Sequence, residues 1–495
     1  MPGLAASLHS PERTKLGGYD FYREVLGSPK YVVAPMVDQS ELAWRKLSRK
    51  YGAQLVYTPM INAKMFAQDM RRQYREQAFN TTFGEEGGPE DRPLIVQFCA
   101  NDPEQLLVSA RAVEGYCDAV DVNLGCPQDI ARRGHYGSFL QDEWDLIYNL
   151  INTLHRNLNV PVTAKFRVFS TVEKTVEYAK MLERAGAQIL TCHGRTREQR
   201  GHKSGLADWE KIRAVKEAVS VPVFANGNIL FHSDIERCLK ATGADAVMSA
   251  EGNLYNPAIF CAADPFVSTS GPASSSSSPS SGPTSGSDAV SLLSEYLTGM
   301  HPRCTQLARE YLAIVKSQRT PTAPSAVKGH LFKLLRPALG KEKDLREQLG
   351  RARIDKNDDS VALTRYGEIV DELNKRMERD EIATEGKDPG SLVVTDGPTG
   401  LPVLPHWLVQ PYFRPLPPAD SDATKGKASV ENAAAREPVS AMAEVAPGTP
   451  SSDVATLSGK RSVTERAPDP EEDGRRDQGK RVKLETVEGL ALQSE

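Results

Sequence analysis

The stretch that decides the fold is Asp121-Val-Asn-Leu-Gly-Cys-Pro127. A strand is predicted from Asp118 to Leu124. The glycine then allows an abrupt turn, and the proline fixes the direction in which the chain leaves. Cys126 therefore lies on a loop at the carboxyl end of a strand, three residues after Asn123. Catalytic groups collect at this edge in parallel α/β proteins. A single cysteine is more often inert packing, so the interpretation depends on the rest of the chain.

Short apolar segments alternate with longer amphipathic segments on both sides of this stretch. The predicted strands are Tyr31–Met36, Ala53–Thr58, Pro93–Cys99, Ala119–Leu124, Val162–Arg167, Gln188–His193, Val221–Asn226 and Ala244–Ser249. The predicted helices between them are Glu41–Tyr51, Pro103–Glu114, Glu143–Asn157, Val172–Ala185, Trp209–Ala218 and Asp234–Thr242. This α/β pattern has the size of a (β/α)8 TIM barrel of about 230 residues. The alternative is an open doubly wound sheet.

Polar residues at the strand ends favour the barrel over the open sheet. They are Pro35-Met36, Gln97, Asn123 with Cys126, Lys165 with Arg167, His193 with Arg195, Asn226-Gly227 and Ala250-Glu251-Gly252. A barrel brings all of them to one rim, whereas an open sheet collects only those near a switch point. The glycines after the last two strands suit a phosphate site at helix N-termini. A planar cofactor with a phosphate tail, such as FMN, fits this rim, and a phosphorylated sugar would use the same corner.

Bulk composition excludes several classes of protein. The net charge of the 495 residues is −4, so nucleic-acid binding would need a local basic patch. The 7 cysteines have neither CxxC spacing nor a zinc pattern, which suits a reducing compartment and predicts no metal site. No apolar signal segment opens the chain, and no run approaches the ~20 apolar residues of a membrane span. We therefore expect a soluble intracellular protein without membrane contact.

The domain organisation is predicted from shifts in composition. Residues 1–18 are expected to be a flexible N-terminus, 19–265 the barrel, and 266–287 a disordered insertion rich in Ser, Pro and Gly. A small all-α domain is expected over 288–381. Its helices are predicted at Ala289–Thr298, Thr305–Lys316, Ser325–Leu335, Lys343–Arg351 and Val361–Arg379. The tail, 382–495, is expected to be mostly disordered. An aromatic stretch at 401–414 is the exception, and it either docks on the folded part or binds a partner.

Basic residues cluster in three places. The helical region carries Lys328, Lys333, Arg336, Lys341, Lys343, Arg346, Arg351, Arg353 and Lys356. The loops leaving the rim carry Arg132, Arg133, Arg195, Arg197, Arg200 and Lys203. Both sets are candidates for phosphate contacts with RNA. The third cluster, Lys480–Lys483, resembles a nuclear import signal read by importin. The expected location is therefore the cytoplasm, the nucleus or both.

Six motifs together resemble the tRNA-dihydrouridine synthase family. They are Val33-Ala-Pro-Met-Val-Asp-Gln-Ser-Glu-Leu42, Leu94-Ile-Val-Gln-Phe98, the stretch Asp121–Pro127, Ala164-Lys-Phe-Arg167, Thr191-Cys-His-Gly-Arg-Thr196 and Phe224-Ala-Asn-Gly-Asn-Ile229. The segment Arg132-Arg-Gly-His-Tyr-Gly-Ser-Phe-Leu140 adds to the resemblance, which runs from about Gly18 to Phe260 and more loosely to about residue 380. The opening Gly18–Lys30 is similar to the eukaryotic group that acts on tRNA positions 16 and 17. Asn228 departs from the pattern, since many relatives have Asp there.

The resemblance implies an FMN enzyme that reduces the C5–C6 bond of uridine in the tRNA D-loop, with NADPH or NADH as the reductant. Hydride from the reduced flavin would reach C6, and Cys126 would protonate C5 as the general acid. Asn123 and Arg167 would contact the substrate. The FMN would be held by Pro35, Met36, Val37, Gln97, Lys165, His193, Asn226, Gly227, Asn228, Ala250 and Glu251. The target uridine would have to be splayed out of its stack to reach this site.

Two rival functions remain open at this point. A flavin-dependent oxidoreductase of a small pyrimidine-like molecule would use the same barrel, although it would not need the basic helical region. A catalytically inactive RNA-binding protein would not need the complete rim with Cys126. A requirement for polymeric RNA tests the first alternative, and bound flavin tests the second.

Overall fold

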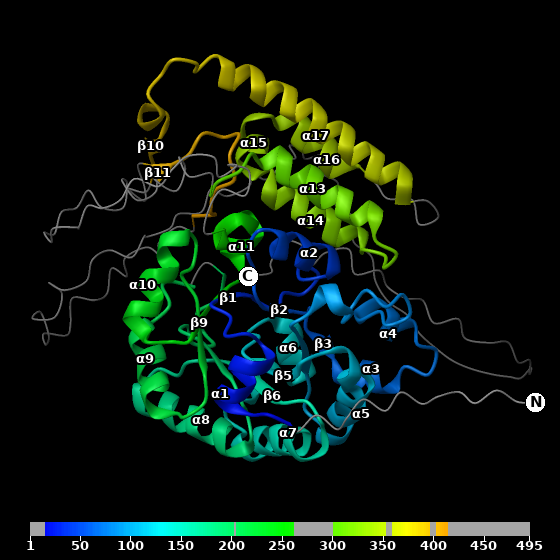
Figure 1. Ribbon diagram of the computed structural model, residues 1–495, viewed down its shortest axis with the longest axis vertical. Helices are drawn as coiled ribbons and strands as arrows, with labels where there is room; N and C mark the ends of the chain where they lie inside the picture. Colours follow the sequence, from blue (N-terminus) through cyan, green and yellow to red (C-terminus); the bar gives the residue numbers. More distant parts are fainter. Residues whose placement is uncertain (1–14, 202–203, 262–299, 353–358, 397–401, 414–495) are drawn as a thin grey trace, which may run out of the picture.

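The computed structural model describes residues 15–201, 204–261, 300–352, 359–396 and 402–413, and it contains a parallel β-barrel ringed by helices (Figure 1). The strands are β1 (Tyr31–Val33), β2 (Val56–Tyr57), β3 (Ile61–Asn62), β4 (Leu94–Cys99), β5 (Ala119–Leu124), β6 (Val162–Arg167), β7 (Leu190–His193), β8 (Val223–Asn226) and β9 (Ala246–Ser249). They are ordered β1-β9-β8-β7-β6-β5-β4-β2, and a parallel bridge between Val32 and Leu55 closes the circle. The predicted barrel is confirmed.

The second predicted strand is the main difference. Instead of one strand over 53–58, short β2 pairs with the start of β4, and β3 pairs with its end. Two further short helices, α3 (Ala63–Gln68) and α4 (Gln73–Ala78), follow β3 before the chain returns to the barrel. Six-residue helices carry too little periodicity to be distinguished from loops by sequence.

The longer outer helices lie close to their predicted positions. They are α2 (Leu42–Lys50), α5 (Pro103–Val113), α7 (Trp144–Asn157), α8 (Val172–Ala185), α9 (Trp209–Ala218) and α10 (His232–Thr242). Side-chain caps fix several of their starts: the Asp102 carboxylate accepts from Glu104 N and Gln105 N, both at 2.9 Å. Thr171 and Asp208 cap α8 and α9 in the same way.

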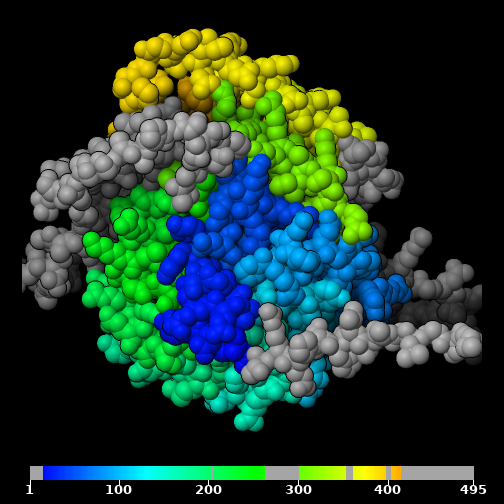
Figure 2. All heavy atoms as spheres, viewed as in Figure 1, coloured from blue at the N-terminus to red at the C-terminus, as the bar shows by residue number. Residues whose placement is uncertain are grey.

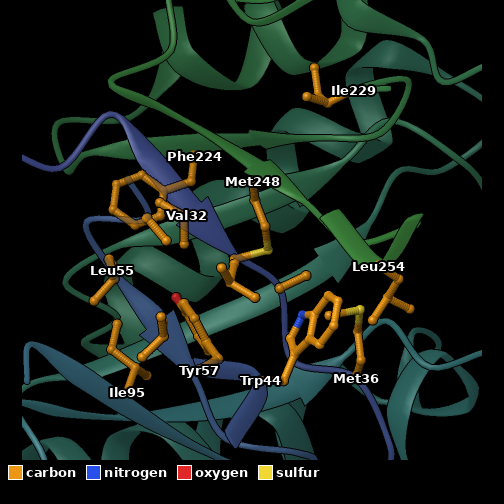
Figure 3. Packing of buried hydrophobic residues seen from close by; sticks show 14 of the residues in the cluster. Val32, Met36, Trp44, Leu55, Tyr57, Ile95, Phe224, Ile229, Met248 and Leu254 are labelled. Carbon is orange, nitrogen blue, oxygen red and sulfur yellow. The ribbon is translucent and has the colours of Figure 1, made fainter. Parts of the chain in front are cut away.

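Alternation along the strands divides the barrel interior into two layers. Strand register places Val32, Leu55, Tyr57, Ile95, Phe224 and Met248 on the inward face of their strands. Figure 3 shows these side chains gathered within the barrel, where they form an apolar floor. The polar residues predicted at the strand ends follow in the same inward phase, closer to the carboxyl ends. The predicted site therefore lies above a packed core rather than over a pore.

The N-terminal segment closes the opposite end of the barrel. Gly18 N donates to the Gln188 side chain at 2.8 Å, and Tyr22 OH donates to Asp245 O at 3.0 Å. Lys15 Nζ reaches His155 O at 2.6 Å, so residues of the predicted flexible N-terminus already contact the barrel. Gln188 and Asp245 lie just before β7 and β9, so this segment lies at the amino ends of the strands; Figure 2 shows it in dark blue on the surface. Ligand access is therefore left to the carboxyl ends.

A second group of helices packs on the barrel at one side (Figure 1). It comprises α13 (Cys304–Ser317), α14 (Pro324–Leu334), α15 (Arg336–Lys341), α16 (Lys343–Arg351) and α17 (Asp359–Ile382). Buried residues of this group belong to the same hydrophobic cluster as the barrel core. Four of these helices were predicted, and α15 was not.

The aromatic stretch docks on the folded part. The buried Trp407 accepts from Cys304 N at 2.9 Å through its carbonyl oxygen. Farther along, Phe413 lies 6.2 Å from Phe231, and Tyr412 stacks on Tyr255 at 5.5 Å. The segment therefore connects the helical group to α10 and to α11 (Glu251–Tyr255) of the barrel.

Several predictions fall outside the described residues. They are the insertion at 266–287, the helix at 289–298, the basic residues Lys203, Arg353 and Lys356, and the tail from 414 onward with Lys480–Lys483. Within the described ranges, no helix has the length and apolarity needed to span a membrane. The same ranges contain no cluster of three or more His, Cys, Asp or Glu side chains suited to a metal ion.

Candidate active site

Cys126 lies where β5 leaves the barrel, and it differs from every other cysteine of the chain. All seven cysteines are free thiols, and the other six are buried. The turn around Cys126 is tightly held. Ser138 donates to Cys126 O from its backbone N at 3.1 Å and from Oγ at 2.9 Å. Gly137 has φ +68°, and a Cβ there would come within 2.8 Å of the same oxygen. Cys126 is partly exposed, and these contacts hold its backbone in place.

The side chain of Asn123 stabilises this turn through hydrogen bonds to its backbone. Its Oδ1 accepts from Gly125 N at 3.1 Å and from Cys126 N at 2.9 Å. Its Nδ2 donates to Gln97 Oε1 at 2.8 Å. One N–H of the Asn123 amide remains for a ligand, so the predicted substrate contact stays a prediction.

Lys165 projects from the neighbouring strand, in register with Asn123. Its ammonium has no hydrogen-bond or ion-pair partner among the described residues. Burial lowers the pKa of Lys165 to about 8, and nearby Arg167 adds to this shift, while Asp121 opposes it. A half-buried cation without a partner is suited to an anionic ligand group.

Arg167 holds neighbouring loops of the rim together. Its Nε donates to Gly125 O at 2.9 Å, and its Nη1 donates to Thr196 O and Gln199 O at 2.9 and 2.8 Å. The buried guanidinium thus connects the loops after β5 and β7. The predicted contact between Arg167 and the substrate stays a prediction.

His193, the last residue of β7, and Arg195 in the loop that follows form one polar unit. Arg195 Nη1 donates to His193 Nε2 at 3.2 Å, which places the imidazole proton on Nδ1. Burial and the cations around it hold the pKa of His193 well below its usual value, so the ring is neutral. Arg195 also donates to Gly205 O at 3.0 Å and to Asn228 Oδ1 at 2.9 Å. It is built into the rim rather than projecting as a loop arginine.

The turn after β8 needs its unusual sequence. Gly227 has φ +113°, and a Cβ there would lie 2.7 Å from Ala207 Cβ and 3.1 Å from the His193 ring. Asn228 follows with φ +62° and donates through Nδ2 to Ala207 O at 3.2 Å. An aspartate could not make that donation, so the departure noted in the sequence has a local reason. Asn226 donates to Met248 O at 3.0 Å.

The remaining predicted cofactor residues lie on both sides of the point where the barrel closes. Met36 is buried beside Trp44 and Leu254 (Figure 3), whereas Val37 is 47% exposed. Pro35, Ala250 and Glu251 are half-buried. The predicted residues therefore surround one rim, as a barrel requires.

The loop arginines predicted to contact phosphates fall into two groups. Arg197 pairs with Asp142 at 3.0 Å, and Arg200 pairs with Asp129 at 3.0 Å. Arg132 and Arg133 on α6 (Asp129–Gly134) are exposed, and neither has an ion-pair partner in the described part of the chain. Arg132 and Arg133 therefore remain the clearest candidates among the loop arginines for contacts with RNA phosphates.

The basic patch of the helical region is largely engaged by the protein itself. Lys333 donates to Gln39 Oε1 at 2.9 Å, Arg336 lies 3.6 Å above the Tyr412 ring, and Lys341 pairs with Asp380 at 2.5 Å. Lys343 and Arg346 on α16 are exposed and have no side-chain partner in the described ranges. The sequence could not separate the two groups, because each partner comes from a distant segment.

Comparisons with known proteins agree with this geometry. Residues 32–281 match the family model described as "Dihydrouridine synthase (Dus)". The tRNA-dihydrouridine(16/17) synthase of Saccharomyces cerevisiae is 46% identical over 81% of this chain and 87% of its own length. The Schizosaccharomyces pombe protein of that name is 45% identical over 81% and 92%. A human tRNA-dihydrouridine(20a/20b) synthase-like protein is 39% identical over 46% of this chain and 70% of its own. The chain belongs to the dihydrouridine synthase family.

Proposed function

We propose that this protein reduces uridine to dihydrouridine in the D-loop of tRNA, at positions 16 and 17, with FMN as cofactor and NADPH or NADH as reductant. The observation that carries the proposal is the partly exposed Cys126 at the rim of the barrel, near Lys165, whose ammonium has no partner in the described part of the chain. The positions are supported by the two fungal relatives, which align through the helical region, whereas the 20a/20b relative aligns over about half the chain.

The residues present suit FMN. Lys165 offers a cation without a partner among the described residues, and Gln97 keeps one N–H after donating the other to Asp121 at 2.8 Å. Gly227 leaves the turn after β8 without a side chain beside His193. FMN, reduced by the nicotinamide, would supply the hydride that C6 of the uridine receives.

The protein's own groups would complete the reaction. Cys126 would donate its thiol proton to C5 as charge develops there. Lys165 is protonated below a pKa of about 8, and its ammonium would stabilise negative charge in the site at neutral pH. The Ser138 and Asn123 hydrogen bonds would hold the Cys126 backbone still while the proton moves.

The decisive assay uses the purified protein, NADPH and unmodified tRNA, with dihydrouridine mapped by position. Product at positions 16 and 17 is expected. Reduced flavin without dihydrouridine in any tRNA, together with turnover of free pyrimidines, would instead establish the small-molecule alternative. Cellular tRNA from a strain lacking the protein serves as a second substrate, because it carries the other modifications.

A further inference from the structure

We propose that Asp121 is a positioning residue that sets the Cys126 turn through the side chains of Gln97 and Asn123. The inference rests on the function proposed above for Cys126. Asp121 belongs to the defining motif, yet it is fully buried within the barrel and nothing in the reaction requires it to touch a ligand.

The path of hydrogen bonds begins at the buried Asp121 carboxylate. Thr163 Oγ1 donates to Asp121 Oδ1 at 2.5 Å, and Gln97 Nε2 donates to Asp121 Oδ2 at 2.8 Å. Gln97 Oε1 in turn accepts from Asn123 Nδ2 at 2.8 Å. Register explains the path, because Gln97 pairs with Asp121 and Asp121 pairs with Thr163 on adjacent strands.

The path of hydrogen bonds ends at the turn that contains Cys126. Asn123 Oδ1 accepts from the backbone N–H groups of Gly125 and Cys126, at 3.1 and 2.9 Å. An unbroken path of hydrogen bonds therefore runs from the buried carboxylate to the backbone of Cys126.

Both ends of the path fix its direction. An ionised carboxylate only accepts hydrogen bonds, and backbone N–H groups only donate them. The amides of Gln97 and Asn123 can satisfy both ends in one orientation alone. A flipped Gln97 would place its oxygen against a carboxylate oxygen, with no proton between them. The carboxylate thus orients the amides, and the amides orient the turn.

A buried carboxylate is costly to keep, which argues against an accidental occurrence. Burial raises the pKa of Asp121 to about 6, although the hydrogen bonds from Thr163 and Gln97 oppose the shift. The charged Lys165 faces the same space from β6, with Arg167, Cys126 and Cys192 around it. A neutral side chain would avoid this cost if only packing were needed.

The test compares variants that break the path with variants that preserve it. Asp121→Leu removes the acceptor for Gln97, and Gln97→Met removes the link in the middle. Asp121→Asn keeps an acceptor. The double variant Gln97→Glu with Asp121→Asn transfers the carboxylate from β5 to the neighbouring strand β4. In that double variant the introduced amide would donate to the new carboxylate, which would still accept from Asn123.

The readout is the rate at which iodoacetamide alkylates Cys126 in the full-length, ligand-free protein. The other six cysteines are buried, so native-state labelling mapped by peptide mass reports on this thiol. We expect each breaking variant to change the rate by about fivefold or more, and both preserving variants to stay within about twofold of the wild type. Melting temperatures measured in parallel monitor folding.

Three outcomes would overturn the proposal. These are breaking variants that lower the melting temperature without changing the alkylation rate, an unchanged rate in Gln97→Met, and a double variant that deviates as much as Asp121→Leu. If Asp121→Leu does not fold, Gln97→Met and the double variant still decide the question. Because labelling needs neither cofactor nor tRNA, an error in the proposed function would leave this result intact.

Discussion

At the scale of single residues, Cys126 combines an accessible thiol with a backbone fixed from two sides. We expect Cys126→Ala to bind FMN and accept electrons from NADPH as the wild type does, because the loss removes only a proton donor. Uridine reduction should fall by about a hundredfold or more. Flavin bleaching by NADPH, followed by single-turnover reoxidation with tRNA, separates the two steps.

Cys99→Ala is the matched control for that experiment. Cys99 is a buried cysteine in a small apolar cluster with Tyr136, and Cys126 packs against this cluster. Cys99→Ala should retain uridine reduction. Full activity in Cys126→Ala would end the general-acid assignment.

Lys165 gives a prediction about pH. The pKa of Lys165 is lowered from 10.5 to about 8 in the folded protein, chiefly by burial. Between these values the unfolded chain binds the proton and the folded chain does not, so stability from this group rises with pH across that window. Lys165→Met should abolish the rise. Urea denaturation at pH 7.5 and 9.5 should show the wild type gaining about 1–2 kcal/mol relative to the variant. A difference that does not change with pH would contradict the assigned environment.

At the scale of elements, α16 presents Lys343 and Arg346, which are exposed residues of the basic helical patch without a side-chain partner in the described ranges. Lys343→Glu with Arg346→Glu should weaken tRNA binding about fivefold or more and reduce the salt slope by about two. Filter binding at several salt concentrations measures both quantities. Lys375→Glu on α17 is the matched control, because it reverses one exposed charge on another helix.

An unchanged affinity in the α16 variant would show that this helix does not contact the tRNA. Reversal of Lys333 and Arg336 would not give a clear answer, because both side chains also hold the helical group against the barrel. Their loss would lower stability and affinity together.

The elements that the sequence predicts best are those with start and stop signals within their own segment. α8 and α9 agree with the prediction at both ends, since Thr171 and Asp208 cap them within the segment. Short α3, α4, α6 and α15 were missed, because one or two turns do not establish a period. The rim was predicted because strand ends repeat a pattern. The contacts of Arg167 and Lys333 were not, because their partners lie far away in the chain.

At the scale of the whole molecule, the barrel and the helical group share one hydrophobic cluster and a buried polar junction. Glu41, at the start of α2, accepts from Tyr311 OH at 2.7 Å and from His330 Nε2 at 3.0 Å. The His330 ring stacks on Trp44 at 4.0 Å with an interplanar angle of 6°. Burial lowers the pKa of His330, and its Nδ1 has no partner in the described structure, so the imidazole is neutral at pH 7.

This junction predicts how the molecule opens. Glu41→Gln replaces one acceptor oxygen by an N–H group, so that either Tyr311 or His330 faces a donor. The cost should be about 2 kcal/mol, which corresponds to roughly thirtyfold faster amide exchange where the junction governs opening. Hydrogen exchange measured by mass spectrometry should show this in α13 and α14 and leave β5 and β6 unchanged. Glu310→Gln is the control, because Glu310 also joins α13 to α2, but its partner Lys50 is half exposed. Uniform acceleration in barrel and helices alike would mean that the two parts open only together, and that Glu41 stabilises the whole fold rather than their junction.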